Sequence, residues 1–440
     1  MSSPALHLQR VVAAAPSTKI RTAILATALC DALGAPAEFH KRFSFDFIAH
    51  MAPNANFSLP LGVWTDDTSM ALALARSIAT FTDDSGKGTS GSAGGFDEAD
   101  QLDAYYRWAQ EGTLSATGKC FDIGNTIQRA VSIYRDALKA AGHDRKKTVL
   151  QRVGDALSPS ASAEKAKEER DGRRAAAATA LARIGHDLQG AVFGGNGSLM
   201  RVLPVGLAYW RDEAAAAAYA ARSSATTHPN PVCTEACAAW TICIARVVQS
   251  AAGGGPQMTK LDVLHHFAAY PYAAAALKTA LAADVPVPAQ AADDPAAMEA
   301  HYAAHHPLLR LRETALHATP DDDTLAARIR ALLPTAAALP SSGYVVHTLA
   351  AALYAFLATR TFADGALLTA NMGDDADTVA AVYGGLAGVW YASEKRDGGG
   401  DEGAEALFWA PLVREWWGAL VRRDVVEEVA EELVAFAEKQ

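Results

Sequence analysis

The sequence predicts an all-α protein. Alanine supplies much of the apolar content and runs of β-branched residues are few, a composition that favours helix over strand. Apolar residues recur with helical spacing in many segments, whereas no alternation of strands with helices and no repeat of fixed period is visible. We therefore expect a single-domain orthogonal helical bundle that carries surface insertions.

The expected elements follow in chain order. Residues 1–17 are expected to be a flexible N-terminal tail, and residues 18–440 the helical domain. The first helix should run from Thr18 to Leu33, because Gly34 and Pro36 interrupt its pattern. Further helical patterns are Leu102–Trp108, Ala175–Ile184, Ala214–Arg222, Thr234–Ser250, Ala273–Ala282, Leu325–Leu333, Val345–Thr359, Thr378–Ser393 and Val425–Glu438.

Three segments are expected to be insertions, near residues 81–97, 141–175 and 253–340. The first is rich in Gly and Ser and should be a flexible surface loop. The second is highly charged and poor in large apolar residues, so it should be either an exposed helix or a disordered excursion. The third is rich in Ala, Pro and Asp. These insertions are where a changed substrate range would arise.

Composition excludes several classes of protein. Half of the residues are hydrophobic and 20% are charged, so the chain is globular and not disordered. The net charge of −10 argues against nonspecific binding to nucleic acid or to anionic membranes, though not against small phosphorylated ligands. Five cysteines are too few for a disulfide scaffold, and no apolar run reads as a membrane span. We expect a cytoplasmic monomer; the acid-free residues 1–30 only faintly resemble an organelle-targeting leader.

Two acidic clusters, Thr65–Thr68 and Asp374–Thr378, are the main chemical signal. Each stands directly before an apolar run of small residues, where a helix is expected to begin. One oxygen per helix would satisfy N-capping, which is the alternative interpretation. Adjacent carboxylates repel one another, so crowding them at both helix starts favours a bound cation. Carboxylate and hydroxyl ligands without Cys or His suit a hard ion such as Mg²⁺ or Mn²⁺.

Other segments carry weaker signals. Gly194–Arg201 is a glycine-rich turn whose backbone N–H groups could approach a phosphate, with Arg201 as an adjacent positive charge. It matches neither the Walker A nor the dinucleotide fingerprint, so an ordinary tight turn is the alternative. Asp122 could equally cap a helix, and His228 could be a structural loop residue.

Four motifs taken together resemble the ADP-ribosylglycohydrolase family, which includes dinitrogenase-reductase-activating glycohydrolase and the ADP-ribosyl-acceptor hydrolases. In chain order they are Asp31–Glu38, Trp64–Thr68, Gly195–Arg201 and Gly373–Thr378. Secondary matches are Trp108–Gly112, Gly118–Gly124, Thr227–His228 and Ser342–Val346. The resemblance departs from the family pattern at Cys30, where a Gly is usual, and at His347, where an Asp is common. The side chain of Cys30 could interfere with close packing of its helix. The change at His347 could alter one contact at the outer part of the site.

The resemblance implies a site as well as a fold. It implies two Mg²⁺ ions at the bottom of a cleft, with Mn²⁺ as a substitute. Matched by motif position, the metal ligands would be Thr65, Asp66, Asp67, Asp375, Asp377 and Thr378, and the catalytic residues would be Glu38, Asp66, Asp67 and Asp375. Asp122 would hold the substrate ribose, and Asp374 would be a spare carboxylate that caps its helix. The other substrate-binding residues would be Gly195, Asn196, Gly197, Ser198 and His228 along the diphosphate and ribose, and Tyr344 at the adenosine end.

The implied activity is magnesium-dependent hydrolysis of the ribose C1 glycosidic bond in an ADP-ribosylated protein or small ADP-ribose conjugate, with release of ADP-ribose. An acidic pocket suits this reaction because its transition state resembles an oxocarbenium ion. Glu38 could protonate the leaving group or take the proton of water, and both roles stay open. The alternatives are a non-catalytic ADP-ribose-binding or crystallin-like structural member of the same fold, and an unrelated metal-dependent phosphohydrolase. The acceptor (arginine, serine, nucleobase or metabolite) is left open.

Overall fold

The protein is described by a computed structural model over residues 5–82, 88, 94–143, 159–253, 256–314, 324–393 and 404–440. Within these ranges it is helical throughout, with isolated bridges but no strand, so the all-α prediction is confirmed. The α-helices are α1 (Pro16–Gly34), α2 (Asp66–Thr80), α3 (Glu98–Glu111), α4 (Asn125–Ala140), α6 (Pro159–Asp187), α7 (Leu203–Ala208), α8 (Glu213–Ala225), α9 (Pro231–Ala251), α10 (Lys260–Ala269), α11 (Ala275–Leu281), α12 (Ala289–Ala292), α13 (Pro295–His305), α14 (Pro307–Thr314), α15 (Leu325–Arg330), α16 (Val345–Ala358), α17 (Phe362–Ala370), α18 (Ala376–Tyr391), α19 (Ala404–Phe408), α20 (Pro411–Ala419) and α21 (Arg423–Ala437). Three short 3-10 helices are η1 (Leu6–Leu8), η2 (Ala35–Ala37) and η3 (Ala191–Phe193).

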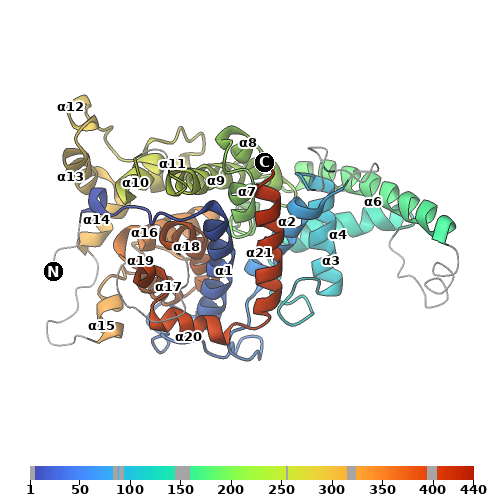
Figure 1. Ribbon diagram of the computed structural model, residues 1–440, viewed down its shortest axis with the longest axis horizontal. Helices are drawn as coiled ribbons and strands as arrows, with labels where there is room; N and C mark the ends of the chain where they lie inside the picture. The colour runs from blue at the N-terminus through green and yellow to red at the C-terminus, as the bar shows by residue number, and fades with distance from the viewer. Residues whose placement is uncertain are drawn as a thin grey trace.

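Helices α1 and α18 form the centre of the fold, and α16, α17 and α21 pack around them (Figure 1). The two central helices approach closely because small residues line their contact. A Cβ on Gly384 would lie 2.5 Å from the carbonyl oxygen of Ala26, and a Cβ on Gly34 would lie 2.7 Å from that of Ala376. The close packing that Cys30 placed in question is therefore kept, because the glycine that faces Cys30 lies on α18.

Two helices are long and apolar enough, by length and composition, to cross a bilayer: the segment Pro16–Ala37, which includes α1, and α9. The sequence-based expectation that no such run exists is wrong on this criterion. In the fold, 89% of the first window and 67% of the second are buried. Helices that are apolar on every face are typical of the core of a large domain, which is where these two lie.

Part of the expected flexible tail lies against the domain. Leu6 is buried and its N–H donates to Glu299 Oε1 at 2.7 Å, and the N–H of Val11 donates to the carbonyl of Met258 at 2.9 Å. Residues 5–15 thus contact the segment expected as the third insertion. Within the expected insertions, residues 83–87, 89–93, 144–158, 254–255 and 315–323 lie outside the described residues.

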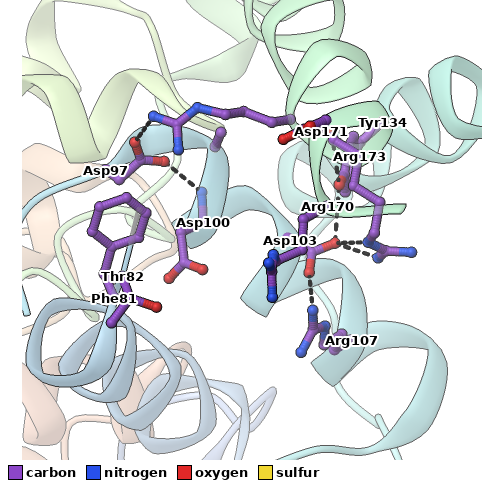
Figure 2. Close-up of a pocket in the computed structure, with 12 residues that line it drawn as sticks. Phe81, Thr82, Asp97, Asp100, Asp103, Arg107, Tyr134, Arg170, Asp171 and Arg173 are labelled. Carbon is purple, nitrogen blue, oxygen red and sulfur yellow. Dashed lines mark hydrogen bonds and ion pairs between the residues drawn. The ribbon is translucent and has the colours of Figure 1, made fainter. Parts of the chain in front are cut away.

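The described part of the second insertion is helix α6, which lies with α3 and α4 at one end of the molecule (Figure 1). Ion pairs fasten α6 to α3 around a small hollow of about 130 Å³ (Figure 2). Asp103 accepts hydrogen bonds from Arg173 and from the hydroxyl of Tyr134, and it pairs with Arg107 at 2.6 Å. Asp97 pairs with Arg174 at 2.5 Å. These carboxylates have basic partners from the neighbouring helix, so we interpret this hollow as structural.

Candidate metal centre and active site

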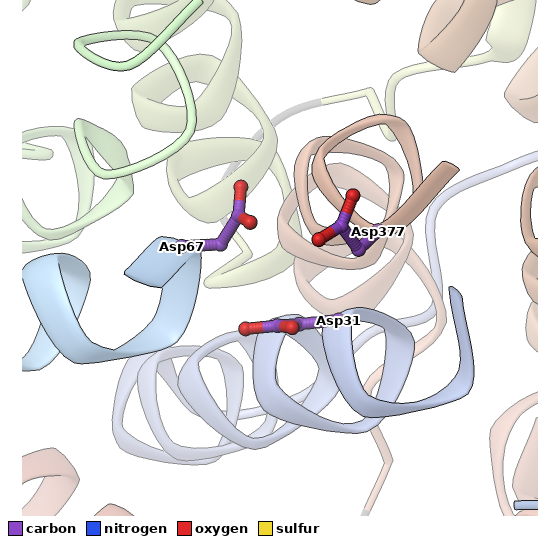
Figure 3. A group of neighbouring side chains, drawn as sticks. All are labelled: Asp31, Asp67 and Asp377. Carbon is purple, nitrogen blue, oxygen red and sulfur yellow. The ribbon is translucent and has the colours of Figure 1, made fainter. Parts of the chain in front are cut away.

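The fold brings the two acidic clusters together. Carboxylates of Asp31 from α1, Asp67 from α2 and Asp377 from α18 point toward one another (Figure 3). One oxygen from each lies within 4.8 Å of the other two. A second group, formed by Glu38, Asp375 and Asp377, meets the same criterion. Asp377 belongs to both groups, so the two lie side by side.

The N-capping interpretation fails at the start of α2, because Asp31 does the capping from another helix. Its carboxylate accepts the backbone N–H of Thr65 at 3.0 Å and that of Thr68 at 3.0 Å. It also accepts hydrogen bonds from the hydroxyls of Thr65 and Thr68, at 2.9 and 2.6 Å. Since α1 supplies these acceptors, Asp66 and Asp67 are not needed as caps.

The start of α18 shows the same absence of local capping. Asp375 occupies the N-cap position, but its side chain makes no capping hydrogen bond to the backbone of the first turn. Asp374 was expected to be the cap, and this is wrong: its carboxylate accepts from Ser341 Oγ at 3.3 Å. Asp374 has φ of 55°, and its N–H donates to the carbonyl of His40 at 2.7 Å. Asp374 therefore ties its loop to the segment that follows Glu38.

Buried carboxyl oxygens without partners show what the cluster lacks. Asp67 Oδ1, Asp377 Oδ1 and Glu38 Oε2 are buried and have no hydrogen-bond partner. Such atoms are costly unless something satisfies them. A divalent cation with oxygen ligands would do so, and the donor set of carboxylates with the Thr65 and Thr378 hydroxyls suits it. The residues present therefore fit a metal site.

Crowding of the carboxyl groups also controls their protonation. Burial raises the pKa of Asp67 and of Asp377, and neighbouring carboxylates raise it further. Burial, followed by the charges of Asp377, Asp122 and Asp375, raises the pKa of Glu38 to about 12. Burial raises the pKa of Asp122 to about 6, while a hydrogen bond from Glu38 acts to lower it. The pKa of Glu38 is thus raised further than that of Asp122, so Glu38 is the member of this pair that holds its proton more tightly.

Part of the cluster lines a cavity of about 640 Å³. The lining also includes Phe39, Asp122 and residues of a glycine loop. Among the described residues that line it, none is Lys or Arg. The sequence-predicted residues that line the cavity are Glu38, Asp66, Asp122, Gly195, Asn196, Gly197, His228, Asp375, Asp377 and Thr378. Thr65 and Asp67 contribute to the carboxylate cluster but are not part of the cavity lining.

The glycine loop, residues 194–198, is fixed to the segment before α16. The N–H of Asn196 donates to the carbonyl of Gly343, and that of Val345 to the carbonyl of Gly194, both at 3.0 Å. The Asn196 amide donates to Asp375 Oδ2 at 2.6 Å, which couples the loop to the acidic cluster. Gly197 is required by space, because a Cβ there would lie 2.8 Å from Ile127 Cδ1 and 2.9 Å from His228 Cε1.

Arg201 does not provide the positive charge that the sequence suggested beside this loop. Its side chain is fully buried behind the loop and donates to the carbonyl of Gly197 at 2.6 Å. It also donates to Thr227 Oγ1 at 2.8 Å and stacks over Tyr105 at 4.5 Å. Arg201 therefore supports the loop from within the protein. Thr227 Oγ1 in turn lies 2.8 Å from Nδ1 of His228, whose pKa is lowered to about 3 by burial and by Arg201.

Two further residues predicted to bind substrate, Ser198 and Tyr344, do not line the cavity. Ser198 is buried and accepts a hydrogen bond from Ser224 Oγ at 2.8 Å, and it is not part of the cavity lining. The Tyr344 ring packs edge-on against His347 at 5.1 Å and also lies outside the lining, so its place at the adenosine end stays a prediction. His347 contacts Ser342 Oγ at 2.8 Å.

Asp31 is the functional candidate that sequence reasoning missed as a site residue. Its motif was noted, but no role was assigned to it. A signal was present, because Asp31 is the only charged residue between Arg21 and Glu38, in a stretch of mainly apolar residues. A lone buried carboxylate in such a helix needs partners, and here these are the start of α2 and the acidic cluster.

Comparison with known proteins agrees with this geometry. ADP-ribosylarginine hydrolase Tri1 of Pseudomonas putida (strain GB-1) is 26% identical, over 85% of this chain and 70% of the relative. The protein of the same name from Serratia proteamaculans (strain 568) is 24% identical, over 96% and 80%. ADP-ribosyl-[dinitrogen reductase] glycohydrolase of Rhodospirillum rubrum is 24% identical, over 84% of each chain.

A solved structure and a family model extend the comparison. The structure of an ADP-ribosylglycohydrolase-related protein complex superposes with a TM-score of 0.53 and 25% identity, covering 96% of this chain and 99% of that one. The family model described as ADP-ribosylglycohydrolase matches residues 13–440. The match spans the helices that carry both acidic clusters, the glycine loop and Glu38. The chain belongs to the ADP-ribosylglycohydrolase family.

Proposed function

We propose that this protein is a hydrolase that cleaves the bond between ribose C1 and the acceptor nitrogen of ADP-ribosylated arginine, releasing ADP-ribose, and that it requires two divalent cations. Mg²⁺ is the ion we propose, with Mn²⁺ as a substitute. The observation that carries the proposal is the pair of carboxylate groups that share Asp377 beside Glu38 and Asp122 in one cavity. Arginine is the acceptor named for two of the relatives.

The residues of the cavity suit the steps of such a cleavage. Bound cations would act as Lewis acids and orient ribose hydroxyls at the floor of the cavity. The carboxylates around Glu38 stabilise the positive charge that develops on the ribose as the bond breaks. Glu38, whose pKa is raised, gives a proton to the leaving nitrogen as the C1–N bond breaks. A water molecule then adds to ribose C1, and the proton that this water loses returns to Glu38. Asp122 would accept a hydrogen bond from a ribose hydroxyl.

Glu38→Gln is the direct test. The amide keeps the size of the side chain but cannot donate and recover a proton, so kcat should fall by about 10² to 10⁴-fold. Binding of ADP-ribose with Mg²⁺, followed by calorimetry, should persist. The assay measures ADP-ribose release from ADP-ribosylated arginine by mass spectrometry. Wild-type protein that binds ADP-ribose without releasing it from any conjugate would establish the non-catalytic alternative, and phosphate release with the ribose linkage intact would establish a phosphohydrolase.

A further inference from the structure

Three phenylalanines gather beside the catalytic carboxyl groups and have no role in the reaction proposed above. Phe39 lines the cavity, yet 66% of it is exposed. Its ring lies 6.2 Å from that of Phe57, which lies 5.6 Å from that of Phe121. We call these three residues the aromatic rim. Phe57 and Phe121 are partly buried beside Phe39 and do not themselves line the cavity. An exposed aromatic side chain beside a site is typical of recognition surfaces.

The backbone holds the aromatic rim in place. Phe39 has φ of 64°, a conformation that is unfavourable for a bulky residue. Its N–H donates to the carbonyl of Asp374 at 2.7 Å, which fixes it to the loop before α18. The Asn56 amide donates to the carbonyl of Glu38 at 2.9 Å, so the turn that carries Phe57 is tied to the same segment.

The place of Phe39 in the cavity lining, with Phe57 and Phe121 beside it, indicates which part of the substrate the rim would face. Phe39 directly follows Glu38, and Phe121 directly precedes Asp122. The glycine loop, which suits the diphosphate, is built from other elements and contacts His228 and Gly343. A substrate whose diphosphate follows that loop and whose ribose C1 lies at Glu38 leaves its acceptor beside the rim.

We propose that the aromatic rim is the acceptor subsite and that it selects a planar guanidinium over a neutral hydroxyl-derived acceptor; this step rests on the proposed function. A guanidinium stacks on aromatic faces and keeps its plane and positive charge when one nitrogen carries ribose. Among the described residues that line the cavity none is Lys or Arg, so no cationic side chain of the lining would repel a guanidinium. A serine-linked acceptor has neither the charge nor the flat face.

Binding measurements in a Glu38→Gln background separate this subsite from turnover. The ligands are ADP-ribose, a peptide carrying ADP-ribosylated arginine, and the same peptide carrying ADP-ribosylated serine, each titrated with Mg²⁺ present. Phe39→Ala and Phe39→Leu should weaken the arginine ligand about tenfold and leave the other two within about twofold, because only stacking is lost. Phe39→Tyr should retain the affinity, and Phe57→Ala should show a smaller loss of the same pattern.

Phe43→Ala is the matched control. Phe43 has φ of 66° and is 46% exposed, like Phe39, but it does not line the cavity. Its removal should change none of the three affinities. Equal weakening of all three ligands by Phe39→Ala would show that Phe39 only positions Glu38, and an unchanged arginine affinity would show no contact; either result overturns the subsite. Failure of the wild-type protein to release ADP-ribose would instead overturn the proposed function and leave the binding comparison readable.

Discussion

The Asp377→Asn variant should be more stable than wild type without divalent cations and less stable than wild type with Mg²⁺. Without cations, Asp377 is a buried carboxylate whose oxygens lie within 4.8 Å of those of Asp31 and Asp67. Two unit charges at that separation repel by about 3.5 kcal/mol at an effective dielectric of about 20. Partial protonation relieves some of this repulsion, so the amide should stabilise the metal-free protein by about 1–3 kcal/mol.

When cations are bound, the substitution should destabilise the protein instead of stabilising it, because Asp377 belongs to both carboxylate groups. A cation present at 100 times its Kd stabilises the fold by about 2.7 kcal/mol per site. The variant loses this stabilisation at both sites. For a chain of 440 residues the unfolding entropy makes 1 kcal/mol equivalent to about 1 °C in Tm. The variant should therefore melt about 1–3 °C above wild type in EDTA and several degrees below it in Mg²⁺.

The assay is thermal unfolding followed by circular dichroism, in EDTA and across a Mg²⁺ titration. Asp374→Asn is the matched control, because Asp374 stands three residues earlier and belongs to neither group. Its curve should follow wild type in both conditions. An Mg²⁺-induced rise in Tm of equal size in wild type and Asp377→Asn would refute the assignment of Asp377 as a shared ligand, and a variant that fails to fold in EDTA would refute the argument from repulsion.

Three other predictions concern the loop, the ion pairs and acid stability. Gly197→Ala should weaken ADP-ribose binding by at least about tenfold in calorimetry, because its Cβ would meet Ile127 and His228; unchanged affinity would mean that the loop does not face the ligand. Asp103→Asn should destabilise the fold by about 2 kcal/mol in urea unfolding while kcat/KM stays at the wild-type value, because it breaks partly buried pairs far from the carboxylate cluster; an equal loss of activity would connect α6 to the site. His306 accepts the N–H of Leu308 at Nδ1 and contacts the carbonyl of Leu281 at Nε2, so the fold binds the neutral ring, and burial lowers its pKa to about 4. The unfolded chain binds the proton first, so stability should fall by up to about 3 kcal/mol as the pH drops from about 6.5 to about 4, and His306→Gln should flatten this part of the pH profile.

Local signals in the sequence predicted most of the carboxylate cluster. Crowded carboxylates at the starts of two helices are visible without any tertiary information, and the apolar pattern of Thr18–Leu33 predicted most of α1. The pattern was weaker between residues 253 and 340, where Ala, Pro and Asp give little contrast between faces. Helices α10 and α12–α14 there were not predicted individually.

Tertiary contacts decide what the sequence left open or mistook. Asp31 caps α2 only because α1 crosses the start of that helix, and nothing in the residues around Asp31 specifies that crossing. Arg201 follows the glycine loop in sequence, but its guanidinium is directed inward by Tyr105 and Thr227, which come from distant segments. The exposure of Phe39 depends likewise on its backbone bond to Asp374.

The pairing of α1 with α18 also determines when the protein can fold during synthesis. Helix α1 ends at Gly34 and its main packing partner is complete only at Tyr391. At about 5–20 residues per second, a ribosome takes roughly 20–70 s to make the intervening chain. For that time α1 lacks its main packing partner, and the two halves of the carboxylate cluster are not yet both synthesised. The central helix pair can therefore form only late in translation.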